Sequence, residues 1–128
     1  QMSVDLSIII VSYNTRAVTL ACLESLYRYP PPVPFEVIVL DNASPDNSFD
    51  VISAEFPQAI AIANADNVGF AAGNNVAIAR ATGRRILLLN PDTLILPGTF
   101  EGLWAFAEST PAAPKMVSSC WRPSWAST

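Results

Sequence analysis

The sequence predicts an α/β fold, in which a mostly parallel sheet carries helices on both faces. Short runs of apolar, β-branched residues alternate with segments whose apolar residues recur at helical spacing. The apolar runs are continuous, which is typical of strands that are buried on both faces. Strands that alternate with helices are joined by right-handed crossovers, so we expect the order β-α-β-α-β-α-β-α.

Four apolar runs are expected to form the strands. The first is LSIIIV and the second is FEVIVL; a weaker third run and the run RILLL follow them. Each is four to six residues long and is bounded by turn-forming residues, as strands are. The expected strands are Leu6 to Val11, Phe35 to Leu40, Ile60 to Ala63 and Arg85 to Leu89.

Helices are expected between and after these strands. Asn14 or Thr15 can cap the first helix, and the proline-rich segment Tyr29 to Pro34 ends it. Gly83 is expected to be the C-terminal stop of the third helix. The remaining expected helices are Asn47 to Phe56, Phe70 to Ala81 and Pro97 to Glu108.

Composition excludes several classes of protein. Hydrophobic residues make up 51% of the 128 residues, charged residues make up 14%, and the formal charge is −4. This is a globular composition without the basic surface that binds nucleic acid. The chain has no histidine, which excludes His-based catalytic triads within it, and its two cysteines are too few for a disulfide framework or a zinc site. With no secretion signal and no apolar run long enough to span a bilayer, the sequence predicts a cytoplasmic protein.

The composition divides the chain at about residue 110. Residues 1–110 carry the strand and helix patterns, whereas residues 111–128 contain three prolines, several serines and two tryptophans. We expect one domain over 1–110 and an irregular tail over 111–128, with the sheet ending at its fourth strand.

Polar residues follow every expected strand. They are Ser12-Tyr13-Asn14, Asp41-Asn42, Asn64-Ala65-Asp66-Asn67 and Asn90-Pro91-Asp92. Such residues are common turn formers, which is the plain alternative for any single loop. Ligands of open α/β sheets bind beyond the carboxyl ends of the strands, so four such loops together favour a shared ligand. The dinucleotide-binding glycine motif and the P-loop are both absent. An acidic residue after the second strand suits a nucleoside, and Asp92 suits a divalent cation, because Mg²⁺ often takes only one or two protein carboxylates.

Four motifs follow one another along the chain: SIIIVSYN from Ser7, VLDNAS from Val39, NVGFAAGNN from Asn67 and LLLNPD from Leu87. Together they resemble family 2 glycosyltransferases of the GT-A fold, in the branch that contains bacterial rhamnosyltransferases. The resemblance runs from about Val4 to about Glu108. It implies the Rossmann-like, nucleotide-sugar-binding half of the GT-A fold, here truncated.

The resemblance also implies residue roles. Ser12, Tyr13 and Asn14 would border the base, and Asp41 would contact the nucleoside. Asn90-Pro91-Asp92 stands where the family has Asp-x-Asp, so Asp92 would bind Mg²⁺ or Mn²⁺. Gly69 and Gly73 have a second reading, close packing of a helix on the sheet. The expected nucleotide-sugar-binding residues are Ser12, Tyr13, Asn14, Asp41, Asn67, Gly69, Asn74, Asn90 and Asp92.

The implied activity is inverting transfer from a UDP- or dTDP-sugar, dTDP-rhamnose being one candidate, to a cell-envelope glycan or lipid-linked acceptor. The full-length protein would then act at the inner face of the membrane. The family's carboxylate base and acceptor half are expected beyond residue 128, because Glu101 and Glu108 fit the exposed face of a helix. A non-catalytic nucleotide-binding α/β module stays open as the alternative, and so does an α/β interaction or receiver-type domain that binds no nucleotide.

Overall fold

A computed structural model of the chain describes residues 4–109 and 116–117. It contains a five-stranded sheet of order β3-β2-β1-β4-β5, in which every strand pair is parallel. The elements are β1 (Leu6–Ser12), α1 (Arg16–Arg28), β2 (Phe35–Asp41), α2 (Ser48–Glu55), β3 (Ile60–Ala63), α3 (Phe70–Arg80), β4 (Arg85–Leu89), α4 (Thr99–Glu108) and β5 (Met116–Val117). The predicted α/β fold class is confirmed, and the four predicted strands agree with the observed ones to within one residue.

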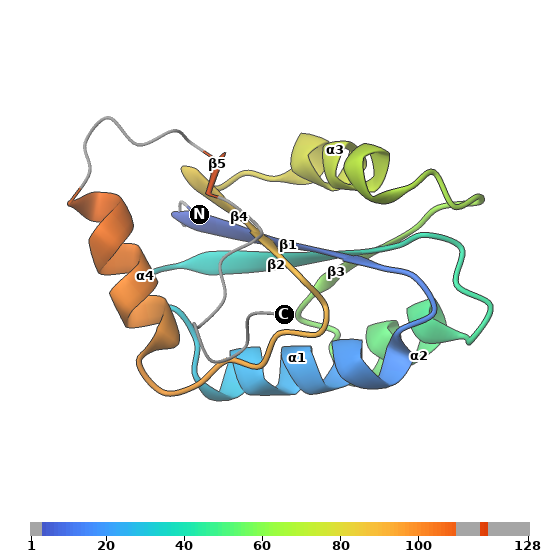
Figure 1. Cartoon of the computed structure of the whole chain (residues 1–128), viewed down its shortest axis with the longest axis horizontal. Coiled ribbons are helices and arrows are strands. Elements are labelled where there is room, and N and C mark those ends of the chain that lie inside the picture. Colours follow the sequence, from blue (N-terminus) through green and yellow to red (C-terminus); the bar gives the residue numbers. More distant parts are fainter. Residues whose placement is uncertain (1–3, 110–115, 118–128) are drawn as a thin grey trace.

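Helices cover both faces of the sheet (Figure 1). Helix α3 lies on one face, and α1 and α2 lie on the other. Successive side chains of a strand point to opposite faces. Ile8 and Ile10 of β1 therefore join the larger core with α1, whereas Ile9 and Val11 join the core beneath α3. All four of these residues are buried, which explains the unbroken apolar run in the sequence.

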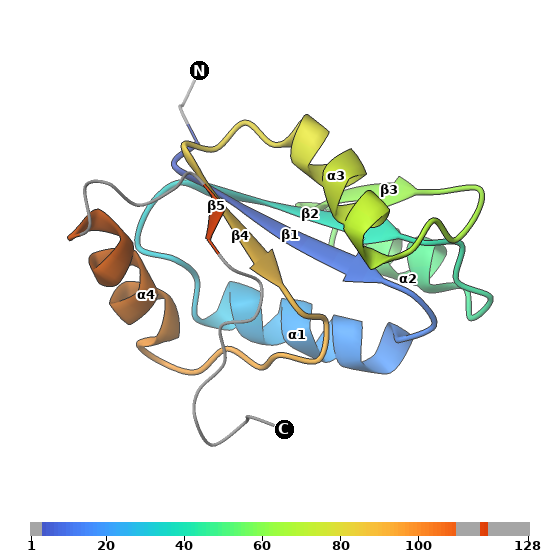
Figure 2. The ribbon, with the colours of Figure 1, turned by 45° about the horizontal axis from the view of Figure 1, so that its top comes forward.

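Helix α4 is attached at the amino end of β4 (Figure 2). Glu108 of α4 accepts hydrogen bonds from Arg85 Nε at 3.2 Å and Arg84 Nη2 at 3.3 Å. The Arg84 guanidinium also lies 5.8 Å from the Trp104 ring centroid, within the range of a cation–π contact. Glu101 and Glu108 are both exposed, as expected for the outer face of this helix.

The short strand β5 corrects the expectation that the sheet ends at its fourth strand. Met116 and Val117 pair in parallel with Ile86 and Leu87 of β4. Two residues cannot show a period, so the sequence pattern carries no signal for this strand. Its pairing depends on the edge that β4 offers, which is a tertiary effect. The other residues of the tail expected over 111–128 lie outside the described residues.

Gly83 is a second correction, because it does not end a helix. Helix α3 ends at Arg80 and its cap is Ala81, in an extended conformation. A Cβ atom at Gly83 would lie 2.6 Å from the backbone nitrogen of Ser7, so only glycine fits against β1. Gly83 N–H donates to Ser7 Oγ at 2.8 Å, and Ser7 Oγ donates to Glu36 at 2.6 Å.

The described helices give no membrane span: none of them combines the length and the apolar character that crossing a bilayer requires. The longest, α1, has 13 residues.

Candidate functional site

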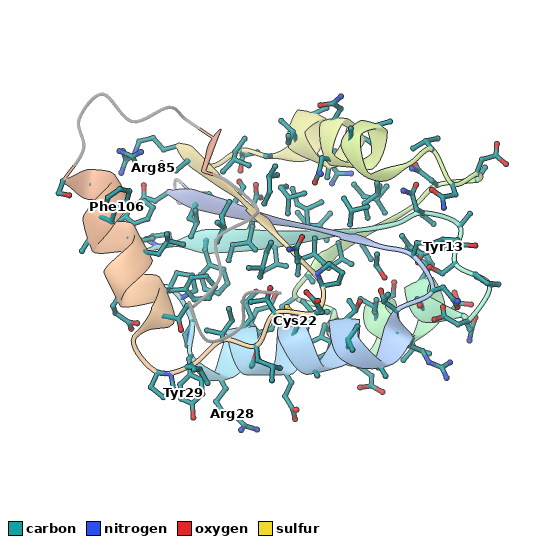
Figure 3. The ribbon with its side chains drawn as sticks, in the orientation of Figure 1. Tyr13, Cys22, Arg28, Tyr29, Arg85 and Phe106 are labelled. Carbon is teal, nitrogen blue, oxygen red and sulfur yellow. The ribbon has the colours of Figure 1, made fainter. Side chains whose placement is uncertain are left out.

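The ends of β1, β2 and β3 lie side by side. Ser12 is paired with Asp41, and Asp41 is paired with Ala63 of β3. Strand β4 runs beside β1, with Leu89 opposite Ile10. The four polar loops therefore begin at the same, carboxyl edge of the sheet. Figure 3 labels Tyr13 at this edge and Arg85 near the opposite one.

Asp41 is a buried carboxylate at this edge, with only 5% of its surface exposed. Its Oδ2 accepts a hydrogen bond from Ser44 N–H at 3.0 Å. Its Oδ1 is buried, and among the described residues it meets no hydrogen-bond donor. Buried polar atoms without a partner are rare because leaving them unpaired costs free energy. Asp41 Oδ1 is therefore an acceptor that a bound donor group would stabilise.

The loops after β1 and β2 are joined to each other. Asn14 N–H donates to Ser44 Oγ at 2.8 Å. Arg16 donates twice to Asp46, from its backbone N–H to Oδ2 at 3.1 Å and from Nη1 to the backbone oxygen at 2.8 Å. The hydrogen bond from the Ser48 hydroxyl, followed by those from backbone N–H groups, lowers the pKa of Asp46 although burial opposes the shift. The two loops thus hold Ser44, and through it Asp41, in a defined place.

These two loops also contain backbone conformations that are unfavourable for most residues. Asn14, Ala43 and Asn47 have φ angles of 53°, 63° and 63°, in the left-handed region. Asparagine adopts this region more readily than other residues, whereas alanine pays a steric penalty for its Cβ. No other non-glycine residue of the described ranges has a positive φ. Strain of this kind clusters at functional sites.

The hydroxyl group of Ser12 contacts other side chains of the protein and does not face solvent. It is fully buried, and its Oγ lies 3.1 Å from Thr15 Oγ1 and 3.3 Å from Thr19 Oγ1. These contacts connect β1 to the start of α1, where Thr15 occupies the cap position without a side-chain cap hydrogen bond. Its neighbours Tyr13 and Asn14 are exposed. Of the three residues expected to border a base, only these two present side chains at the surface.

The loop before α3 contains Asn67 and Gly69. Asn67 Oδ1 accepts the N–H of Gly69 at 2.9 Å, which closes a local turn. Gly69 has a φ of 87°, and no atom lies within 4 Å of the place where a Cβ would be. Glycine is therefore required here by backbone conformation, and the close-packing alternative does not apply to Gly69.

Close packing does apply to Gly73 on α3. An added Cβ would lie 3.0 Å from Leu40 Cδ2 and 3.1 Å from Val11 Cγ1. This contact lets α3 approach the sheet near the ends of β1 and β2. Its neighbour Asn74, an expected site residue, is 6% exposed.

Asn42 was not among the expected site residues, yet its side chain makes three hydrogen bonds. Nδ2 donates to the Gly69 oxygen at 3.0 Å. Oδ1 accepts from Asn64 Nδ2 at 3.0 Å and from Val68 N–H at 3.3 Å. The sequence feature that could have identified Asn42 is its position directly after a buried strand. Its hydrogen-bond partners lie far away in the sequence, so no local pattern reveals them.

The turn after β4 carries Asn90, Pro91 and Asp92. Thr93 N–H donates to the Asn90 oxygen at 3.1 Å, which closes the turn, and Asp92 is exposed. Burial and then the nearby Asp92 charge raise the pKa of the Cys22 thiol to about 12, so this thiol stays protonated at neutral pH. Asp92 itself follows the carboxyl end of β4, which is Leu89.

Within the described residues, no group of three or more Cys, Asp or Glu side chains could form a complete metal site. Asp92 offers one exposed carboxylate. That donor set fits Mg²⁺ or Mn²⁺ only where water and ligand phosphate oxygens supply the other positions, an arrangement common for Mg²⁺.

The sequence of the chain is similar to a known family and to individual proteins. The model of the family described as "Glycosyl transferase family 2" matches residues 7–119. The minor teichoic acid biosynthesis protein GgaB of Bacillus subtilis is 32% identical over 109 residues, covering 80% of this chain and 12% of the relative. An uncharacterized glycosyltransferase of Haemophilus influenzae is 35% identical over 106 residues, covering 83% of this chain and 35% of the relative.

Solved structures are also similar. Staphylococcus aureus TarS 1–349 in complex with UDP matches with a TM-score of 0.70 and 25% identity, over 82% of this chain and 32% of that one. The mannosyltransferase PcManGT of Pyrobaculum calidifontis, in complex with GDP-Man and Mn²⁺, matches with a TM-score of 0.71 and 24% identity, over 89% of this chain and 34% of that one. The chain thus spans between 12% and 35% of the length of these relatives.

Proposed function

The chain belongs to glycosyl transferase family 2, and on this premise we propose that it forms the donor-binding part of an inverting glycosyltransferase. The donor is a nucleoside-diphosphate sugar. The single observation that carries the proposal is the buried Asp41 oxygen without a donor at the carboxyl edge of the sheet.

Asp41 would contact the nucleoside. An ionised carboxylate accepts hydrogen bonds only, so its Oδ1 selects a ligand that presents N–H or O–H groups. Ribose hydroxyls and the ring N–H of uracil or thymine are such groups. The exposed Tyr13 and Asn14, and the loop of Asn67 and Gly69, border the same edge and would surround the nucleoside.

Asp92 would hold the divalent cation. Bound there, Mg²⁺ or Mn²⁺ would neutralise the diphosphate and stabilise it as a leaving group. Asn90 brings no charge to the turn, although its amide can hydrogen-bond a ribose. A single carboxylate binds such a cation weakly, so we expect nucleotide and metal to bind together.

The donor and acceptor are proposed more narrowly from the relatives. Structures of TarS contain UDP and UDP-GlcNAc, that of PcManGT contains GDP-Man and Mn²⁺, and GgaB is named for teichoic acid biosynthesis. The UDP complexes favour a UDP-sugar, and the name of GgaB favours a cell-envelope glycan or lipid-linked acceptor. The rhamnosyltransferase-like motifs alone add dTDP-sugars, including dTDP-rhamnose, as candidate donors. Such an acceptor would bring the full-length protein to the inner face of the membrane.

The acceptor hydroxyl needs a general base, which family members supply as a carboxylate. Glu108 is paired with two arginines at the amino end of β4. Glu101 is exposed on α4, and Figure 1 shows that α4 lies toward the amino ends of the strands, away from the carboxyl edge. We assign no base within residues 4–109, and the base remains proposed for the part of the full-length protein beyond residue 128.

Calorimetric titration of the 128-residue chain tests the proposal. UDP and dTDP should bind in the presence of Mg²⁺ or Mn²⁺ in the high micromolar range or weaker, on the order of −5 kcal/mol. Without metal the binding should be weaker still. GDP and ADP serve as comparators for the base, and Asp50→Ala, which removes an exposed carboxylate from α2, controls for net charge. Absence of binding with metal would overturn the proposal, and equal affinity with and without metal would remove the role of Asp92.

A further inference from the structure

We infer that Asn42 is a positioning residue, which fixes the loop of residues 67–69 at a set distance from Asp41. The inference rests on the proposed function, because its consequence is measured as nucleoside binding. Asn42 would not touch the nucleoside. It would act through the loop that borders it.

The first support is the arrangement of hydrogen bonds around Asn42. Asn42 is 2% exposed, and its side chain uses both polar atoms, the amide donating to Gly69 and the oxygen accepting from Asn64 and Val68. Its backbone N–H donates to the Ser12 oxygen at 2.8 Å. One residue thus connects the end of β1, the end of β3 and the start of α3.

The loop has little else to hold it. Val68 is 48% exposed, and Asn67 and Gly69 are exposed as well. Within the described residues, each hydrogen bond that joins positions 65–69 to β2 involves the Asn42 side chain. Asn42 directly follows Asp41, the proposed nucleoside contact. The hydrogen bonds of Asn42 therefore hold the loop in a fixed position relative to Asp41.

Gly73 is a second and independent support. An added Cβ at Gly73 would lie 3.2 Å from Asn42 Nδ2. Gly73 N–H donates at 3.0 Å to the same Gly69 oxygen that accepts from Asn42. The missing side chain therefore lets α3 come close enough for Asn42 to reach Gly69. Asn42 and Gly73 determine together how far the loop stands from the sheet.

Two substitutions in the full chain test this. Asn42→Ala removes the three side-chain bonds, and Gly73→Ala removes no polar group but pushes α3 away from Asn42. Each substitution should lower the affinity for uridine and UDP, or for thymidine and dTDP, by the same factor of about ten. This is the loss expected when a displaced loop no longer hydrogen-bonds the nucleoside. The ratio of UDP affinities with and without Mg²⁺ should not change. In the ligand-free protein, amide exchange over residues 65–69 should become faster.

Two controls separate positioning from stability. Asn75→Ala removes an exposed amide from the same helix and should leave affinity unchanged. Ile8→Val, in the core on the opposite face of the sheet from α3, lowers stability without altering the packing beneath α3. The affinities of Asn42→Ala and Gly73→Ala are measured at temperatures below the onset of unfolding of each variant.

The outcomes are distinct. The role of Asn42 would be refuted, and the proposed function left intact, if Asn42→Ala and Gly73→Ala bound nucleoside within twofold of the unsubstituted chain. Unchanged amide exchange over residues 65–69 would have the same meaning. So would an equal loss in Ile8→Val, or a loss confined to UDP with uridine unaffected. No binding of any nucleotide by the unsubstituted chain would instead refute the proposed function, and with it the consequence of Asn42 for binding.

Discussion

Replacement of Asp41 by asparagine should weaken nucleotide binding and stabilise the free protein at the same time. Asp41→Asn keeps the size of the side chain and an oxygen for the Ser44 N–H, 3.0 Å from Oδ2. It exchanges the other, buried oxygen for an amide that can no longer accept a hydrogen bond. The ligand loses its acceptor, and the free protein loses a buried carboxylate with an unpaired oxygen.

The two effects have different sizes. A hydrogen bond to a charged group contributes about 1.5–3 kcal/mol, so the affinity for both nucleoside and nucleotide should fall roughly 10- to 150-fold. The free protein exchanges a buried carboxylate oxygen that has no partner for a neutral amide group that has no partner, and the neutral group is less costly to bury. We expect a gain of about 1 kcal/mol, which raises Tm by about 3–5 °C in a domain of this size.

Calorimetric titration with uridine and UDP measures the first effect, and thermal unfolding followed by circular dichroism measures the second. Asp50→Asn, an exposed carboxylate in the first turn of α2, is the matched control. It should leave binding unchanged and should not raise Tm, because it removes a favourable interaction with the helix dipole. If Asp41→Asn lowered Tm and bound uridine as well as the unsubstituted chain does, the carboxylate would serve the fold and not a ligand. The reasoning from its unpaired oxygen would then be refuted.

Three further predictions concern other parts of the molecule. Asp92→Ala should abolish the metal-dependent part of UDP binding and leave uridine binding unchanged, by titration with and without Mg²⁺; an equal loss for both ligands would contradict its role. Gly83→Ala should cost about 1–3 kcal/mol, since its Cβ would lie 2.6 Å from the Ser7 nitrogen, and a Tm within 1 °C of the original, roughly 0.2 kcal/mol, would show that the contact relaxes. The isolated chain should not transfer sugar from radiolabelled UDP- or dTDP-sugars to a lipid-diphosphate acceptor, because base catalysis alone supplies about 10²–10⁴-fold. If transfer exceeded the no-protein background and Asp92→Ala abolished it, the chain would be catalytically sufficient.

The strands could be predicted because each is a short apolar run bounded by turn-forming residues, and that signal is local. Strand β1 and most of β2 and β4 are buried, whereas the weaker run of β3 is only half-buried. Strand β5 could not be, since two residues carry no period and only the edge of β4 accounts for them. Gly83 follows α3 in the sequence as a helix stop would, and its contact with Ser7 exists only once β1 and β4 are paired. Asn42 has the appearance of an ordinary turn residue because its partners are 22 to 27 residues away. The carboxyl edge was thus predictable as a place, whereas the contacts that organise it depend on tertiary structure.

The central position of β1 has a consequence for how the nascent chain acquires its structure. Of the strands of this sheet, β1 is synthesised before the others and can pair with β2 soon afterwards, but its other neighbour, β4, follows only after α2, β3 and α3. Until then one edge of an apolar strand, with Ile8, Ile9 and Ile10, has no partner. Closing such non-local pairs is slow, and unpaired apolar edges invite association with other chains. Expression at low temperature, or with chaperones that shield this edge until residue 89 has left the ribosome, should therefore raise the yield of folded protein.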